Sequence, residues 1–250
     1  MDRHFRCTAC GKCCFGWLPL TIKDALAHAQ RFPLAVVWTP IKQASKAFDI
    51  TARLGITVRM RNKKQLAVRI VPTGYIPPSM PCPALTSDNL CGIHADKPSR
   101  CRTMPFFPYR EEADQAELLV PRAGWDCDTS SAAPVVYRDK AVVGRMDFDQ
   151  EWGELRDQVP VLRAYGEWLM KSVPGMIDNL TKAVMKPGGG HVVVSFASLL
   201  RHLDGVDKAA LAEWQLPVLA DYMAKTADQP KLAEYHRNYD DWAWEIERLA

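Results

Sequence analysis

In Cys7-Thr8-Ala9-Cys10-Gly11-Lys12-Cys13-Cys14, four thiols fall within eight residues close to the N-terminus. Four further cysteines follow at Cys82, Cys91, Cys101 and Cys127, and the rest of the chain contains none. A cysteine that only fills space in a core stands among apolar neighbours, whereas the first cluster stands among Thr, Gly and Lys. We therefore interpret the eight cysteines as metal ligands around which this part of the chain folds.

Cys7, Cys10 and Cys13 have the C-x2-C-x2-C spacing that is typical of three ligands to one iron–sulfur cluster. A zinc site more often combines two separated C-x2-C pairs. Here the later cysteines Cys82, Cys91 and Cys101 have eight and nine residues between them, so no second pair exists. The spacing favours iron–sulfur, in the form of one or two [4Fe–4S] clusters, and leaves zinc as the alternative.

Cys14 directly follows Cys13, and successive side chains of an extended chain point to opposite sides. We therefore expect the two sulfurs to point to different places. Eight thiols suit two four-ligand sites, and in that case Cys14 and Cys127 complete the ligand set. The alternative for each of these two residues is a free redox or catalytic thiol.

The composition is that of an ordinary soluble globular chain, with 250 residues, 48% hydrophobic and 24% charged. A formal net charge of +3 is too small to indicate nucleic acid as a partner, and no apolar run is long enough to span a membrane. Residues 1–7 lack the apolar core of a secretory signal, so we expect a cytoplasmic protein. Thiols stay reduced in that compartment, which argues against a framework of four disulfides.

Apolar spacing predicts both helices and strands. Helices are expected after Thr21, with Asp24 at the capping-box position, and over Ile41–Leu54, Gln150–Gln158, Val161–Lys171, Met176–Met185, Phe196–Leu203, Lys208–Lys225 and Lys231–Leu249. Strands are expected over residues 56–71 as a hairpin around Asn62-Lys63-Lys64, at Leu118–Val120, and at Val135–Tyr137 with Ala141–Val143.

The segment from Pro72 to Pro108 is too rich in proline for regular structure through most of its length. It also carries three of the cysteines, so we expect bound metal to hold it in place. The predicted fold class is α+β. An irregular, metal-stapled N-terminal domain with short β-hairpins (residues 1–145) precedes a helical C-terminal region (residues 146–250).

Three segments carry a further resemblance. They are Cys7-x2-Cys10-x2-Cys13-Cys14, then Pro81-Cys82-Pro83-x-Leu85, and finally Cys91-x-Ile93-His94-x2-Lys97-Pro98-x2-Cys101-Arg102-x2-Pro105. Together they resemble the YkgJ-like cysteine-cluster family of zinc- or iron-chelating domains, which includes flagellin lysine N-methylases. The resemblance covers about residues 5–108 and implies a metal-binding domain. The sequence departs from the family pattern at His94, Lys97 and Met104, where members usually carry Tyr, Arg and an aromatic residue respectively.

Other candidate residues are weaker. We expect His94 to support the site or to lie on the surface rather than to ligate metal, and Arg102 either to balance thiolate charge or to be an ordinary surface residue. Gly188-Gly189-Gly190-His191 precedes a strand, which is the wrong order for a phosphate-binding turn, so we interpret it as a connector. Arg59 and Arg61 share a face of the predicted hairpin, which we expect to be solvated.

Two functions remain open. The first is a cytoplasmic iron–sulfur protein that acts in electron transfer or in modification of a protein or peptide substrate. The second is a non-catalytic, zinc-stapled interaction module. Either function implies a protein or peptide partner rather than a membrane or a nucleic acid. Whether the protein is an enzyme, and which residues would be catalytic, does not follow from the sequence.

Overall fold

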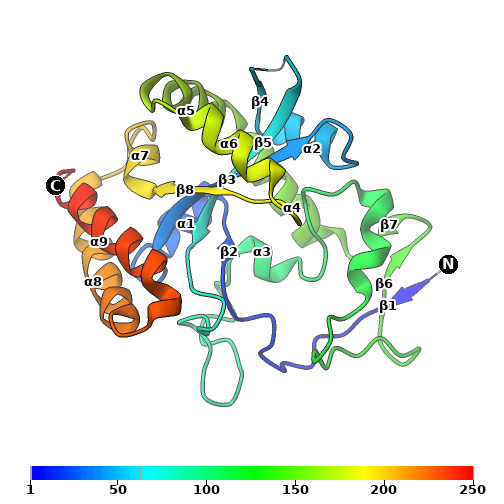
Figure 1. Ribbon diagram of the computed structural model, residues 1–250. Helices are drawn as coiled ribbons and strands as arrows, with labels where there is room; N and C mark the ends of the chain where they lie inside the picture. Colours follow the sequence, from blue (N-terminus) through cyan, green and yellow to red (C-terminus); the bar gives the residue numbers. More distant parts are fainter. Residues whose placement is uncertain (1, 62, 250) are drawn as a thin grey trace.

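The computed structural model describes residues 2–61 and 63–249, and its centre is an antiparallel sheet enclosed by helices (Figure 1). The strands of this sheet run in the order β2 (Leu18–Pro19), β5 (Gln65–Gly74), β3 (Leu34–Lys42) and β8 (Val192–Ser195), and β4 (Ile56–Arg59) pairs with β5 beside β2. β3 pairs with β5 along its whole length, from Leu34 opposite Gly74 to Lys42 opposite Leu66. β8 belongs to the C-terminal half of the chain, so the sheet is assembled from both halves.

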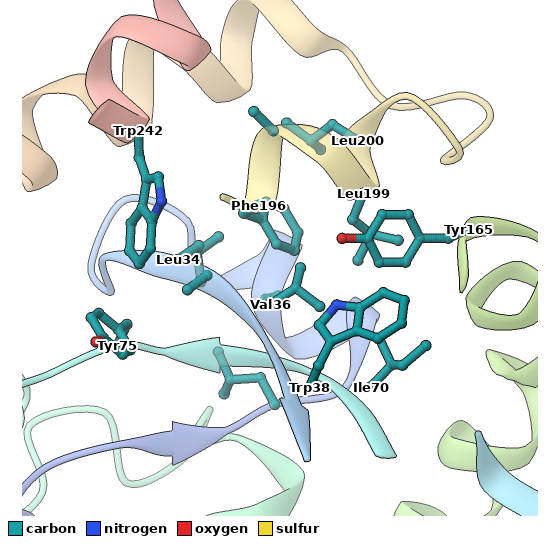
Figure 2. Packing of buried hydrophobic residues seen from close by; sticks show 14 of the residues in the cluster. Leu34, Val36, Trp38, Ile70, Tyr75, Tyr165, Phe196, Leu199, Leu200 and Trp242 are labelled. Atoms are coloured by element: carbon teal, nitrogen blue, oxygen red, sulfur yellow. The ribbon is translucent and has the colours of Figure 1, made fainter. Parts of the chain in front are cut away.

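The main core lies against one face of β3. Every second side chain of a strand points to the same face. The side chains on this face of β3 are those of Leu34, Val36 and Trp38, and all three are fully buried. In Figure 2 these side chains meet Tyr165, Phe196 and Leu199, which come from the helices of the C-terminal half. Burying a side chain of this size stabilises the fold by about 1.5–3 kcal/mol. The large aromatic and aliphatic residues therefore bind the two halves of the chain into one core.

Helices cover the sheet and fill the C-terminal half. Their bounds are α1 Ile22–Ala27, α2 Phe48–Leu54, α3 Ser99–Arg102, α4 Arg145–Asp157, α5 Val159–Ser172, α6 Met176–Met185, α7 Phe196–Leu200, α8 Lys208–Thr226 and α9 Ala233–Glu247, with 3-10 turns η1 Glu112–Leu119 and η2 Pro230–Leu232. Among the described residues, no helix has the length and apolar character needed to cross a bilayer.

A second, smaller sheet lies next to the N-terminus. It joins β1 (Arg3–His4), β6 (Val135–Arg138) and β7 (Ala141–Val142). Asp139 and Lys140 link β6 to β7 with φ angles of 49° and 64°, which is the left-handed backbone that tight hairpins require. Phe106, Tyr137 and Phe148 form a separate apolar cluster behind this sheet. The sheet ties the first residues of the chain to a segment more than 120 residues later.

Most of the predicted elements are present, and the α+β class is confirmed. The helices predicted after residue 146 correspond to α4–α9, and α6 has the predicted bounds. The Thr21 hydroxyl accepts the Asp24 N–H at 3.0 Å, which is the expected cap of α1. The two predicted hairpins form, although Asn62 of the first turn lies outside the described residues. The predicted division at residue 145/146 falls at the start of α4, while β8 returns to pair with β3.

Two predictions are wrong. The helix expected over Ile41–Leu54 begins only at Phe48, because Ile41 and Lys42 are the end of the long strand β3. Pro40 is tolerated in this strand because β8 pairs with β3 only as far as Trp38.

The strand expected at Leu118–Val120 is also wrong, since Leu118 and Leu119 belong to the 3-10 turn η1. The buried Gln115 amide holds that turn. Its nitrogen donates to the carbonyls of Phe107 and Arg110, and its oxygen accepts the Phe107 N–H. A single polar side chain therefore overrides the β propensity of the apolar residues that follow it.

Candidate metal centre

The first four cysteines lie on a loop that turns back on itself. Ala9 and Gly11 have φ angles of 56° and 72°, and the Cys14 N–H donates to the Gly11 carbonyl at 3.0 Å. A Cβ on Gly11 would lie 3.0 Å from the Asn89 side chain, so the loop packs closely against the segment that precedes Cys91. Glycine at position 11 therefore permits both the turn and the close approach.

One backbone pairing brings Cys127 to the start of this loop. The Arg6 N–H donates to the Asp128 carbonyl at 2.8 Å, and the Asp128 N–H donates back to Arg6 at 3.0 Å. The Thr8 hydroxyl adds a bond to the Asp126 carbonyl at 2.9 Å. Because Arg6 faces Asp128 in an antiparallel bridge, Cys7 and Cys127 lie on facing positions.

The electrostatics of Cys127 match this placement. Burial raises the pKa of the Cys127 thiol, and the neighbouring thiols of Cys10, Cys7 and Cys13 raise it further. The structure thus brings together a first set of thiols, which consists of Cys7, Cys10, Cys13 and Cys127.

A second pairing joins Cys14 to the proline-rich segment. The Cys82 N–H donates to the Cys14 carbonyl at 2.7 Å, and Phe15 forms an antiparallel bridge with Pro81. A further bridge connects Leu85 with Cys91, so the chain doubles back and returns Cys91 to the neighbourhood of Cys82. The short helix α3 supplies Cys101.

The thiols of this segment also affect one another. Burial raises the pKa of Cys101 to about 12, and Cys82 contributes the next largest increase. The pKa of Cys82 is raised by burial and by Cys91. The thiols of Cys82, Cys101 and Cys91 likewise act on Cys14. The second set of thiols therefore consists of Cys14, Cys82, Cys91 and Cys101.

Cys13 and Cys14 stand where the two sets meet. Their sulfurs lie 4.0 Å apart, so the expectation that the side chains point to different places is wrong. Both residues belong to the turn that begins at Gly11, and the alternation of an extended chain does not apply there. A hydrogen bond between the two sulfurs raises the pKa of Cys13 and lowers that of Cys14.

A buried ion pair anchors α3 and, with it, Cys101. Arg100 lies 3.4 Å from Glu151 of α4, and both side chains are almost completely buried. The Arg100 guanidinium also donates to the Phe106 carbonyl, and Thr103 donates to Glu151. Burial lowers the pKa of Arg100 and raises that of Glu151. No local sequence pattern predicts this pair, because its members lie 51 residues apart.

A second group of polar contacts holds the start of α3. Asp24 accepts the Ser99 N–H at 3.1 Å, and the Ser99 hydroxyl donates to Glu154 at 2.8 Å. The Thr21 hydroxyl donates to the same carboxylate at 3.2 Å. Helices α1 and α4 are therefore both bonded to the helix that carries Cys101.

The other candidate site residues are Arg102, His94 and the glycine stretch before β8. Arg102 is paired with Asp147 at 3.6 Å, and the positive charge that acts on Cys101 comes from Arg100 instead. His94 is exposed. The glycine stretch ends at His191, whose ring packs edge-on against Trp17 at 4.3 Å. Two cations that the sequence did not single out act on the thiols, namely Lys97 on Cys13 and Arg31 on Cys82.

The donor set fits a thiophilic metal. All eight cysteines are free thiols, and thiolate donors select zinc or iron–sulfur clusters over hard cations. Among the described residues, no group of three or more Cys, His, Asp or Glu side chains already stands in coordination geometry. Backbone pairing is thus what gathers the thiols, and the side chains would still have to rotate inward to bind a metal.

Comparison with protein families supports this assignment. Residues 6–121 match a family model described as "CxxCxxCC: Putative zinc- or iron-chelating domain". This part of the chain is similar to the CxxCxxCC family. The CxxCxxCC domain contains seven of the cysteines and ends before Cys127, although the structure places that thiol with Cys7. Searches of curated proteins and of solved structures gave no match. The protein is thus a metal-binding cysteine-cluster protein.

Proposed function

We propose that the protein binds iron–sulfur clusters through its two thiol sets and acts in electron transfer or in modification of a protein or peptide substrate. The observation that carries this proposal is that separate backbone pairings place Cys127 opposite Cys7 and bring Cys14 and Cys91 to the neighbourhood of Cys82, which we interpret as two sets of four thiols. Four thiolates are the usual ligand complement of a [4Fe–4S] cluster, and the C-x2-C-x2-C loop is a typical source of three of them.

The chain's own residues would prepare the thiols for binding. Metal ligation requires deprotonated thiols. The positive charges of Lys97, Arg31 and Arg100 oppose the increase in the pKa values of Cys13, Cys82 and Cys101 respectively. Burial acts in the opposite direction, so binding would release protons from the more buried thiols. The cations would then partly balance the negative charge of a thiolate-bound cluster.

The location of the thiols suits exchange with a partner. An iron–sulfur cluster supplies a centre that accepts and donates single electrons. Cys7 and Cys13 are exposed, and the apolar side chains of Phe15 and Leu90, beside Cys14 and Cys91, are 45% and 50% exposed. A partner protein could cover these exposed side chains and approach the thiols directly. Reduced thiols also suit the cytoplasm, where we place the protein.

The zinc-stapled interaction module is the second candidate, and metal analysis separates the two. Anaerobically purified protein should contain iron and acid-labile sulfide at about four to eight atoms of each per chain. Its visible absorption should bleach on reduction with dithionite. The matched control is a variant in which Cys7, Cys10, Cys13 and Cys127 are all replaced by Ser, which should retain about half of the iron.

Stoichiometric zinc with negligible iron, from cells supplied with both metals, would contradict the iron–sulfur proposal and favour the interaction module. Loss of all iron from the four-Ser variant, with its fold intact by circular dichroism, would contradict the division into two independent sets.

A further inference from the structure

A groove lies beside β4. Figure 1 shows β4 at the end of the main sheet that lies away from the proline-rich segment. The groove has a volume of about 640 Å³. Residues 55–59 form one wall, and the other wall consists of Arg163, Glu167, Met170 and Lys171 of α5 with Ile177 of α6. A second hollow of about 320 Å³ continues from it past Arg61 and Asp178. The two hollows share Arg59, Met170, Lys171 and Ile177, so they form one continuous groove.

The wall on the β4 side is the edge of a strand. Side chains of a strand alternate between its two faces, so a groove that touches five consecutive residues must border the backbone edge. Among the described residues β4 pairs with β5 alone, which leaves its other edge toward the groove. The Arg163 guanidinium accounts for one edge group, since its Nε donates to the Gly55 carbonyl at 3.1 Å. An unpaired edge of this kind accepts an added strand.

The side chains along the groove favour an acidic occupant. Four basic residues line it, against only Glu167 and Asp178 on the acidic side. Arg61 is paired with Asp178 at 2.7 Å. Arg59 and Lys171 are exposed, and within the described part of the chain neither forms an ion pair. These two side chains are available to carboxylates of a partner.

Buried or partly buried apolar side chains alternate along β4 with exposed polar ones. Ile56 and Val58 face the main core beneath α5, whereas Thr57 and Arg59 are exposed. Met170 and Ile177 offer apolar surface on the opposite wall. A strand added to β4 would therefore present alternate residues to an apolar and to a basic environment.

We propose that this groove binds an extended peptide segment, with alternating acidic and apolar residues, of a partner protein, by adding it to β4 as a further strand. The proposal goes beyond metal binding and does not depend on which metal the thiols hold. A second copy of this chain is the less favourable occupant, because it would add the basic side chains of its own groove, among them Arg59 and Lys171, to an already basic surface.

Binding can be measured by fluorescence anisotropy with metal-loaded protein. The probe is a labelled peptide of alternating Glu and Val, about eight residues long, which is within the usual length of a strand. We expect saturable binding that weakens as salt is added. Arg59→Glu and Lys171→Glu should each weaken it at least tenfold. Lys46→Glu, in an exposed loop outside the groove, is the matched control and should bind as the unaltered protein does.

A second peptide tests the strand itself. Methylation of alternate backbone nitrogens keeps every charge and removes the donors that would pair with β4, so it should abolish binding. Equal binding of the methylated peptide, or unchanged binding by Arg59→Glu, would overturn the proposal. A concentration-dependent dimer that excludes the peptide would also overturn it. Metal content should be the same in all variants, so failure here is distinguishable from failure of the iron–sulfur proposal.

Discussion

At the scale of single residues, adjacent Cys13 and Cys14 decide how the thiols are shared. Their sulfurs are 4.0 Å apart, yet Cys13 acts on Cys127 while Cys14 is affected by Cys82, Cys101 and Cys91. Cys13 also acts on Cys101, so its thiol interacts with members of both sets. The sequence predicted eight ligands but could not divide them, because the division depends on backbone pairings such as Arg6 with Asp128.

We expect Cys14→Ser to remove the metal of the second set and to leave that of the first nearly intact. The reason is that Ser replaces a thiolate whose neighbours are Cys82, Cys91 and Cys101. Iron and sulfide analysis of the purified variant measures the loss, which should be about half. Cys10→Ser is the control that should lose the other half. Full metal retention in Cys14→Ser, together with loss of alkylation by a thiol reagent, would identify Cys14 as a free thiol instead.

At the scale of elements, the short helix α3 depends on the ion pair behind it. Four residues make too little of a helix to be stable alone. Arg100 and Glu151 are 7% and 4% exposed, and Arg100 fastens the helix to α4. Removing only one partner of such a pair destabilises the fold, because the remaining charge stays buried without a counter-charge.

Arg100→Met should therefore lower the free energy of unfolding by about 3–5 kcal/mol, measured by urea denaturation of metal-loaded protein. Arg102→Met is the matched control, since its pair with Asp147 is partly exposed, and it should cost about 1 kcal/mol or less. The double variant Arg100→Met/Glu151→Leu should recover part of the loss. Equal costs for the two single variants would show that α3 is held in place by other contacts.

Elements with a strong local signal were predictable, and elements that depend on distant partners were not. α6 was predicted with its observed bounds because its apolar face repeats at helical spacing between two prolines, Pro174 and Pro187. β3 was missed because it is buried on both faces and contains Pro40, so it shows neither alternation nor an ordinary strand composition. The polar bonds of Gln115 that stabilise η1 also join residues that no local pattern connects.

At the scale of the whole molecule, the N-terminal and C-terminal halves share the core, and the thiol segments lie at its margin. β5 ends at Gly74, and the chain then carries Cys82 and Cys91 through turns without a helix until α3 begins at Ser99. Met80, Cys82 and Ile93 of these turns pack against the larger core but are only partly buried, whereas residues of the sheet such as Trp38 are fully buried. Bound metal should therefore determine the order of the proline-rich segment more than that of the sheet.

We expect limited proteolysis after metal removal to cut first between residues 76 and 97, while the sheet and α5–α9 resist. A structural metal site can contribute on the order of 10 kcal/mol to folding, so its loss should open the segment that it closes. Mass spectrometry of the fragments locates the cuts, and the metal-loaded protein is the control. Cys101→Ser should reproduce the pattern without a chelator. Unchanged resistance of that segment would contradict a structural role for the metal.

The pairing of Arg6 with Asp128 also has a consequence during protein synthesis. Of the eight cysteines, those from Cys7 to Cys14 leave the ribosome first, and Cys127 follows only after more than 110 further residues have been made. Cys101 emerges earlier, so the set that begins with Cys14 becomes complete before the set that begins with Cys7. β8, the edge strand that completes the main sheet by pairing with β3, emerges later than the last cysteine of either set. During translation, therefore, the set that begins with Cys14 can bind metal before the set that begins with Cys7, although Cys7 is made first.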